Sequence, residues 1–150
     1  MVTIKAKRGL DIPIHGAPAS HTVVDRLDVQ RVALLPQEHW GAKVRMLVQE
    51  GDAVRVGTPL FADRRDENVM YVSPAAGKVS AVNRGLRRVV QSIVVDADNF
   101  TDSEPFEPVD IASASREVIA GAIAGSGLWP ALRRRPYDRV AISTEEPAGI

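Results

Sequence analysis

The chain offers few side chains that could perform chemistry. It contains no cysteine, which excludes thiolate nucleophiles, disulfides and thiolate-held iron–sulfur clusters within these 150 residues. The three histidines, His15, His21 and His39, lack the spacing of metal ligands on one element and have no acidic companion pattern. We therefore predict no metal site and no catalytic residue, and we expect each histidine to lie in a turn.

Composition excludes two classes of function. Basic and acidic residues balance at 19 each and aromatic residues make up 5%, so the chain has neither the field nor the stacking rings typical of nucleic-acid binding. No apolar run approaches the ~20 residues that span a bilayer. The early basic residues are not followed by a secretory apolar core. We predict a protein that is not exported and has no transmembrane segment of its own.

The stretch from Val44 to Phe61 is the element around which the rest of the chain is organised. Apolar and polar residues alternate from Val44 to Val48, which predicts a strand with one buried face. Gly51 and Asp52 then form a turn signal, and Gly57 follows before the next apolar pair. Glycine supplies positive φ and the Asp52 side chain can bond its own turn backbone, so we predict strand, turn and short strand.

A weaker copy of this stretch follows 34 positions later. The aligned pairs are Val48 with Val82, Gly51 with Gly85, Leu60 with Val94 and Phe61 with Val95. The second half opens at a turn that contains Gly77. Two repeats are too few for a solenoid, so we predict a small closed β module with two similar halves. The predicted structural turn residues are Gly51, Asp52, Gly57, Gly77 and Gly85.

The pattern Gly-Asp-x-Val-x-x-Gly-x-x-Leu, followed by Pro-x-x-Gly-x-Val, resembles the biotinyl/lipoyl-type barrel-sandwich fold. In carriers of that fold, a lysine flanked by methionine lies at the hairpin between the halves. The corresponding residues 62–70 contain no lysine here, so the resemblance implies the fold without the swinging arm.

We expect a mainly β, lipoyl-like barrel-sandwich hybrid with an extended N-terminal arm and a short helical C-terminal appendage. The predicted units are a strand (2–7) and an arm (8–18) within residues 1–29, the barrel-sandwich domain over 30–97, an acidic linker over 98–112, and a helical segment over 113–150. The last unit has no closing element and is expected to open a truncated second domain of α/β type. Helices are expected only after residue 110.

The C-terminal segment has clear helix signals. Ser115 is the expected N-cap of a helix that starts at Arg116 and ends at Gly125–Gly127. A second short helix is expected near Trp129, ending in the basic triplet Arg133–Arg135, which we interpret as a solvated helix end. The alternative for the triplet is contact with an acidic protein partner or with lipid headgroups. The large apolar residues expected to be buried here are Leu128, Trp129 and Leu132.

Motifs on both flanks point to one family. In chain order they are Gly9-Leu10-Asp11-Ile12-Pro13-Ile14-x-Gly16-x-Pro18, Val32-Ala33-Leu34-Leu35, Asn83-Arg84-Gly85-x-x-Arg88 and Ser126-Gly127-Leu128-Trp129-x-x-Leu132-Arg133-x-x-Pro136. With the glycine-turn module they resemble the A subunits of the bacterial Na⁺-translocating NADH:quinone reductase. The resemblance implies the N-terminal part of a peripheral subunit of a respiratory, Na⁺-translocating complex, on the cytoplasmic face of the bacterial inner membrane.

The same resemblance implies where the cofactors are. NAD, flavin and iron–sulfur centres are expected in partner subunits, quinone is the substrate of the complex, and this chain is expected to hold no cofactor and to be non-catalytic alone. Related flavin-binding subunits have a glycine-rich flavin loop where this chain has residues 125–135. Trp129, Leu132 and three arginines fill that place, so flavin binding is not carried over.

A quinone-proximal surface is the remaining candidate site. Its predicted contributors are Trp40, Trp129, Leu132 and Arg133. Aromatic faces can stack on the ring, Leu132 can cover the tail and Arg133 can donate to a carbonyl oxygen. The favoured alternative is that both tryptophans are buried packing residues, with Trp40 covering an end of the barrel, and that Arg133 only caps a helix.

Two other classes of function share this fold. One is a lipoyl or biotin carrier domain, and the other is an export-pump adaptor. The missing signal peptide and the absence of long heptad helices argue against the adaptor.

Overall fold

The computed structural model describes residues 16, 20, 22–23 and 28–146. The strand expected over 2–7, most of the arm expected over 8–18, and the histidines His15 and His21 lie outside the described residues. The strands are β1 Arg31–Leu34, β2 Val44–Met46, β3 Ala53–Val54, β4 Pro59–Asp63, β5 Asp66–Val72, β6 Ala76–Arg84, β7 Val90–Asn99, β8 Arg133–Arg134 and β9 Arg139–Val140. The helical elements are η1 Pro36–Glu38, η2 Leu86–Arg88, α1 Arg116–Gly125 and η3 Trp129–Ala131.

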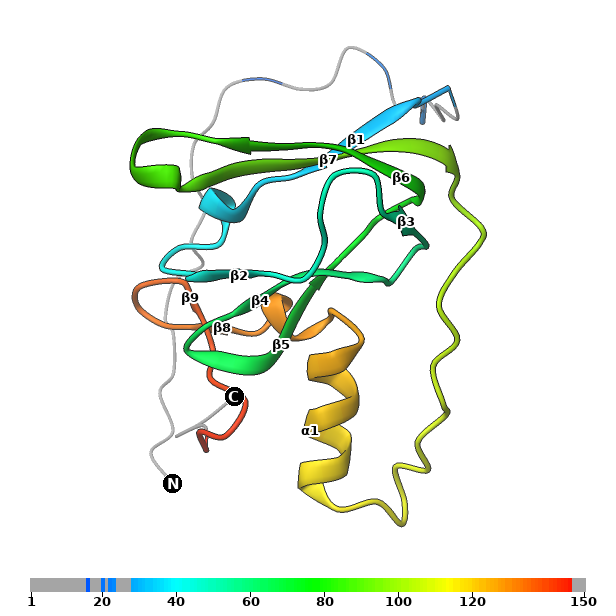
Figure 1. Cartoon of the computed structure of the whole chain (residues 1–150). Helices are drawn as coiled ribbons and strands as arrows, with labels where there is room; N and C mark the ends of the chain where they lie inside the picture. The colour runs from blue at the N-terminus through cyan, green and yellow to red at the C-terminus, as the bar shows by residue number, and fades with distance from the viewer. Residues whose placement is uncertain (1–15, 17–19, 21, 24–27, 147–150) are drawn as a thin grey trace.

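Two antiparallel sheets face each other, as Figure 1 shows. One has the strand order β1-β7-β6-β3 and the other β2-β4-β5, while β8 and β9 form a separate pair. The most deeply buried side chains come from both sheets: Leu60, Phe61, Val69, Val79, Ile93 and Val95. The prediction of a mainly β sandwich is therefore confirmed.

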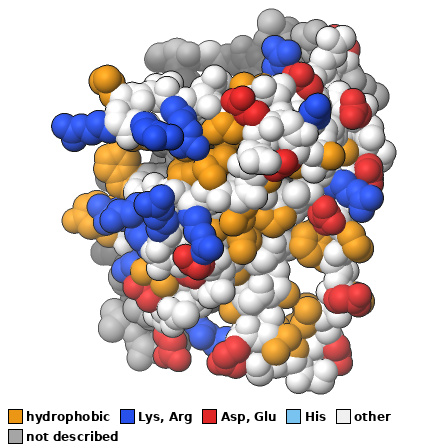
Figure 2. All heavy atoms as spheres, viewed as in Figure 1, with side chains coloured by type: hydrophobic (Ala, Val, Ile, Leu, Met, Phe, Trp, Pro, Cys, Tyr) orange, Lys and Arg blue, Asp and Glu red, His pale blue; other side chains and the backbone are white. Residues whose placement is uncertain are grey.

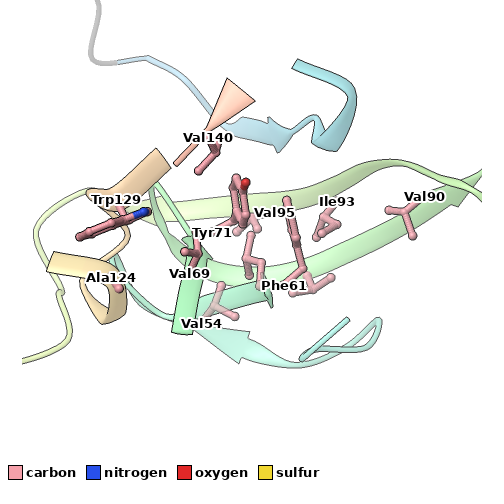
Figure 3. Packing of buried hydrophobic residues seen from close by; sticks show 12 residues of the cluster. Val54, Phe61, Val69, Tyr71, Val90, Ile93, Val95, Ala124, Trp129 and Val140 are labelled. Carbon is pink, nitrogen blue, oxygen red and sulfur yellow. The ribbon is translucent and has the colours of Figure 1, made fainter. Parts of the chain in front are cut away.

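The hydrophobic core extends from the sandwich into the C-terminal segment. Ala124 of α1, Trp129 of η3 and Val140 of β9 belong to the same buried cluster as the strand residues. Figure 3 shows Trp129 and Ala124 at one end of this row of side chains and Val90 at the other. Between β7 and α1 the chain runs along the outside of the molecule (Figure 1). The domain limits expected at residues 97 and 112 stay a prediction.

The hairpin that opens the module folds as its alternation indicates. Val44, Met46 and Val48 pack against the core. Gly51 has a φ of +97° in the turn, and its N–H donates to the Val79 carbonyl of β6 at 2.8 Å. The Asp52 carboxylate accepts from the Gln49 N–H at 2.9 Å. The turn is therefore closed by its own aspartate and held against the opposite sheet.

The two aligned halves of the sequence form similar strands but different turns. The pairs Leu60-Phe61 and Val94-Val95 lie in β4 and β7, each an inner strand of its sheet. Gly85 has a φ of −95°, unlike Gly51, and precedes the 3₁₀ turn η2. The two halves therefore share strands but are connected by different turns.

The α-helix has the expected limits. Its N-cap is Ser115, whose side chain accepts from the Val118 N–H at 3.4 Å, and Glu117 lies in its first turn.

The expectation that helices occur only after residue 110 is wrong for two short elements. A 3₁₀ turn, η1, begins at Pro36, whose fixed φ favours a helical start. The other is η2, at the end of the β6–β7 hairpin. Single turns of this kind produce no apolar period, so periodicity gives no sign of them.

The second C-terminal helix is also shorter than expected. It is the single 3₁₀ turn η3, so its neighbours do not share one helix face with Trp129. Trp129 is 8% exposed, but Leu128 and Leu132 are exposed, which contradicts their predicted burial. Arg133 and Arg134 lie in β8 rather than at a helix end.

Candidate functional site

Three segments that are distant in sequence meet at one end of the sandwich, around the β4–β5 turn. Residues 64–65 form this turn, and the Arg64 N–H donates to the Lys43 carbonyl at 2.7 Å. The Ser143 N–H donates to the Asp66 carboxylate, which attaches the C-terminal segment to the same turn. The hairpin at which a carrier would hold its lysine is therefore fixed on both sides by other parts of the chain.

Asp63 is the buried charge of this end, with a side chain only 3% exposed. Both carboxylate oxygens accept from the Arg65 Nε, at 3.0 and 3.1 Å, and the Arg65 Nη2 forms a further ion pair with it. The backbone N–H groups of Arg65 and Lys43 also donate to it. Burial alone would raise the pKa of Asp63, but these hydrogen bonds and the arginine charge outweigh burial and hold the pKa below its usual value.

Tyr71 lies beside this ion pair and is 2% exposed. Its ring stacks on Phe61 with centroids 4.2 Å apart, and His39 meets it edge-on at 4.6 Å. The buried hydroxyl has no hydrogen-bond partner among the described residues. Desolvation, with a smaller contribution from the Asp63 charge, raises the pKa of Tyr71 to about 12. The phenol is therefore neutral and keeps its proton.

His39 joins this cluster to β8. The Arg133 Nη2 lies 3.4 Å from the His39 Nδ1, and since a guanidinium can only donate, the Nδ1 must be the acceptor. Burial first, and then the Arg133 charge, lower the pKa of His39. A neutral imidazole with its proton on Nε2 follows. The cluster therefore combines a neutral imidazole with a guanidinium group that can donate hydrogen bonds.

The structure separates the four residues proposed for a quinone-proximal surface. Trp40 is 64% exposed on the loop after η1, so the prediction that it covers an end of the barrel is wrong. Arg133 contacts His39, the residue that precedes Trp40 in the chain. Trp129 is buried, and its indole N–H donates to the Ala141 carbonyl at 2.8 Å. Leu132 is partly exposed at 47%. The structure thus associates Arg133 with the Trp40 loop and leaves Trp129 in the core.

Sequence reasoning missed Asp63, Arg65 and Tyr71. A weak signal existed, because Asp63, Arg64, Arg65 and Asp66 place paired charges at a tight turn. Tyr71 follows the buried Val69 by two residues, so it shares the inward face of β5. The contact of Tyr71 with His39 joins the β4–β5 hairpin to the loop between η1 and β2, and it has no local signature.

Two absences can be stated for the described part of the chain. In that part, no three histidine or acidic side chains lie close enough together to hold a metal ion, and the predicted lack of a metal site stays a prediction. None of its helices is long and apolar enough to cross a membrane.

The facing sheets, the glycine turn closed by Asp52, and a central hairpin that holds the Asp63–Arg65 ion pair and no lysine define a barrel-sandwich hybrid. Comparison with known families agrees: residues 4–98 match the model of the NqrA N-terminal barrel-sandwich hybrid domain. The chain belongs to this family.

Curated relatives match the chain almost throughout. It is 47% identical over 150 residues to the A subunit of the Na(+)-translocating NADH-quinone reductase of Hahella chejuensis, and 46% identical over 149 residues to the protein of the same name from Saccharophagus degradans. The protein of that name from Yersinia pseudotuberculosis is 42% identical. Each alignment covers 98% of this chain and 33% of the relative. The chain therefore spans about a third of the length of these relatives.

Proposed function

We propose that this chain forms the N-terminal part of a peripheral subunit of a respiratory Na⁺-translocating NADH:quinone reductase, on the cytoplasmic face of the bacterial inner membrane. The observation that carries the proposal is the 47% identity to the A subunit of such a reductase over 98% of the chain. In this role the chain contributes a folded scaffold to the complex and is non-catalytic by itself, and NADH and quinone are substrates of the assembly.

The proposed scaffold has no redox centre of its own. The absence of cysteine supports this for thiolate-held clusters. In the segment at the place of a flavin loop, Gly127 packs closely on the sandwich: a Cβ there would lie 2.5 Å from the Val72 side chain of β5. The lack of a side chain at Gly127 is therefore used for packing against β5, which supports the proposal that this segment is not a flavin loop.

The test of the scaffold role has two readouts. Full-length protein is tagged and purified from detergent-solubilised membranes, and we expect it to co-purify with partner subunits in a fraction that oxidises NADH with quinone. The 150-residue chain alone is expected to be colourless and inactive. A stoichiometric flavin or iron spectrum in the isolated chain would overturn the absence of a redox centre, and full-length protein that purifies without partners would overturn the scaffold role.

Within this role, we assign a quinone-proximal surface to Trp40, Leu132 and Arg133. Two observations support this assignment. Trp40 is exposed, and its chain neighbour His39 contacts Arg133. The indole face can stack on a quinone ring, and the guanidinium can donate to a carbonyl oxygen. Trp129 is left out because its ring is buried and its N–H is already bonded.

Substitutions in the assembled complex test the surface. Trp40→Ala is expected to raise the quinone Michaelis constant without loss of assembly, because the exposed ring supports no core packing. Trp129→Phe is the matched control, which should affect stability and leave the Michaelis constant unchanged. Normal quinone kinetics in fully assembled Trp40→Ala complex would contradict the assignment.

A carrier domain remains the alternative class. Residues 62–70 contain no lysine to acylate, and the turn they form is held by Asp63 and Asp66. Mass spectrometry of the chain expressed with a lipoyl or biotin ligase decides the matter. We expect the unmodified mass, and acylation within or beside this segment would replace the scaffold proposal with a carrier function.

A further inference from the structure

The end of the β6–β7 hairpin, residues 84–89, presents apolar and basic side chains to solvent. We call these residues the basic tip. Leu86 is 93% exposed and Val89 is 61% exposed, and Arg87 and Arg88 lie between them in the chain. Large aliphatic side chains with this exposure at the end of a hairpin contribute nothing to the core, so the packing of the chain does not explain them.

The basic tip is held in a defined conformation by its own backbone. The Gly85 N–H donates to the Val89 carbonyl at 2.8 Å, and the Arg88 N–H donates to the Gly85 carbonyl at 3.1 Å. Arg87 and Arg88 have φ values of +56° and +59°, a left-handed conformation that non-glycine residues rarely adopt. Side chains kept in such backbone are often retained for a function rather than for stability.

Basic residues are segregated along the sequence at the basic tip. Residues 68–95 contain no acidic residue but include Lys78 and the three arginines of the tip. Five arginines outside the tip form ion pairs in the described part of the chain: Arg31–Asp96, Arg45–Glu67, Arg55–Asp102, Arg65–Asp63 and Arg134–Glu145. Within the described part of the chain, Arg87 and Arg88 have no carboxylate partner. Figure 2 shows basic side chains gathered on the edge where Figure 1 places η2 and the β8–β9 hairpin.

We propose that the basic tip binds the surface of an anionic lipid bilayer. Leu86 and Val89 enter the boundary between headgroups and acyl chains, while Arg87 and Arg88 bind lipid phosphates. This property goes beyond the proposed scaffold role and does not depend on it, because it belongs to the isolated chain.

Two further features favour a bilayer over an acidic protein as the partner. The apolar residues lie at the end of a hairpin with arginines beside them, which matches the layering of an interface with hydrocarbon beneath phosphate. The loop after η1 and the β8–β9 hairpin lie on the same edge in Figure 1. They carry Trp40 and Tyr137, which are 64% and 74% exposed, and such amphipathic rings are enriched at membrane surfaces.

Vesicle co-sedimentation of the 150-residue chain tests the proposal. The probes are vesicles of phosphatidylcholine alone and of phosphatidylcholine mixed with phosphatidylglycerol. We expect binding only to the mixed vesicles, weakened by added salt. Arg87→Asn with Arg88→Asn should lower the association constant about 25-fold, at about fivefold per arginine. Leu86→Ser should lower it about tenfold.

The controls separate the tip from net charge and from misfolding. Asparagine tolerates left-handed backbone, so the double variant should keep the wild-type melting temperature. Arg31→Gln with Arg55→Gln removes the same charge from two paired arginines outside the tip and should change binding less than about twofold. The proposal would be overturned if the control lost as much affinity for the mixed vesicles as the Arg87→Asn, Arg88→Asn variant. Unchanged binding of Leu86→Ser, or equal binding of the wild type to both kinds of vesicle, would also overturn it. Binding to polyglutamate but not to the anionic vesicles would also overturn it and indicate an acidic protein partner.

Discussion

Gly77 of β6 is the position where a single added methyl group should do most damage. A Cβ there would lie 2.0 Å from the Asp96 carbonyl oxygen and 3.1 Å from the Asp98 backbone nitrogen. Ordinary contact begins near 3.4 Å, so β7 would have to move by roughly 1.4 Å, the difference between 3.4 and 2.0. Overpacking of this kind costs about 1–3 kcal/mol. The φ of +157° adds about 1 kcal/mol for a non-glycine residue.

We therefore expect Gly77→Ala to lower the free energy of unfolding by about 3 kcal/mol, and the melting temperature by about 6–12 °C for a chain of this size. Gly51→Ala should cost only about 1 kcal/mol, because φ is positive but the nearest atom, Lys78 Cε, is 3.9 Å away. Gly121→Ala on α1 meets open space and should stabilise by up to about 1 kcal/mol. Urea unfolding of the three variants measures the order. A Gly77→Ala variant as stable as the wild type would refute the reasoning.

Three further predictions concern the site and the tryptophans. Asp63→Asn should lower the free energy of unfolding at neutral pH by about 2 kcal/mol, because the carboxylate accepts charged hydrogen bonds from Arg65. The folded pKa of Asp63 is depressed, so wild-type stability should fall as the pH drops below about 4, and the variant should show a shallower acid limb in a urea series. Tyr71→Phe should leave stability unchanged or raise it by up to about 1 kcal/mol, since the hydroxyl is buried without a partner. Because the folded pKa is raised to about 12, wild-type stability should decline above about pH 10 more steeply than that of the variant, and a clearly destabilised variant would reveal a partner for the hydroxyl. Trp40→Phe should remove the acrylamide-accessible fluorescence and keep the melting temperature, whereas Trp129→Phe should remove the protected fluorescence and lower that temperature; the reverse assignment would contradict the described burial.

Sequence patterns predicted the elements that are determined by residues close together in the chain. Alternation from Val44 to Val48 indicated a strand because one of its faces is buried. Ser115 indicated the start of α1 because a hydroxyl that accepts from the first-turn N–H groups acts within four residues. Gly51 indicated the turn because glycine readily adopts positive φ, which is also a local property of the chain.

The failures arose where the tertiary structure decides. Trp40 was expected to be buried, since large aromatics usually are, but the loop after η1 places it in solvent. Leu128 and Leu132 were expected to be buried with Trp129 by a second short helix, but η3 is a single 3₁₀ turn and leaves both leucines exposed. The cluster around Tyr71 joins the β4–β5 hairpin, the loop after η1 and strand β8, and no pattern within any one of these segments reveals their contacts. Side-chain partners across the fold are set by topology, which periodicity does not encode.

The β4–β5 hairpin shows how this fold differs from one that presents a mobile arm. A swinging arm requires a turn free of contacts, so that the attached group can reach other sites. Here the Asp63–Arg65 ion pair stiffens the turn from within, and the Asp66 carboxylate binds the Ser143 N–H of the C-terminal segment. Breaking this ion pair should cost about 2 kcal/mol, because the buried carboxylate would lose its charged hydrogen bonds. The turn is therefore held in place by the same contacts that attach the C-terminal segment, and this geometry suits a fixed surface better than a moving carrier.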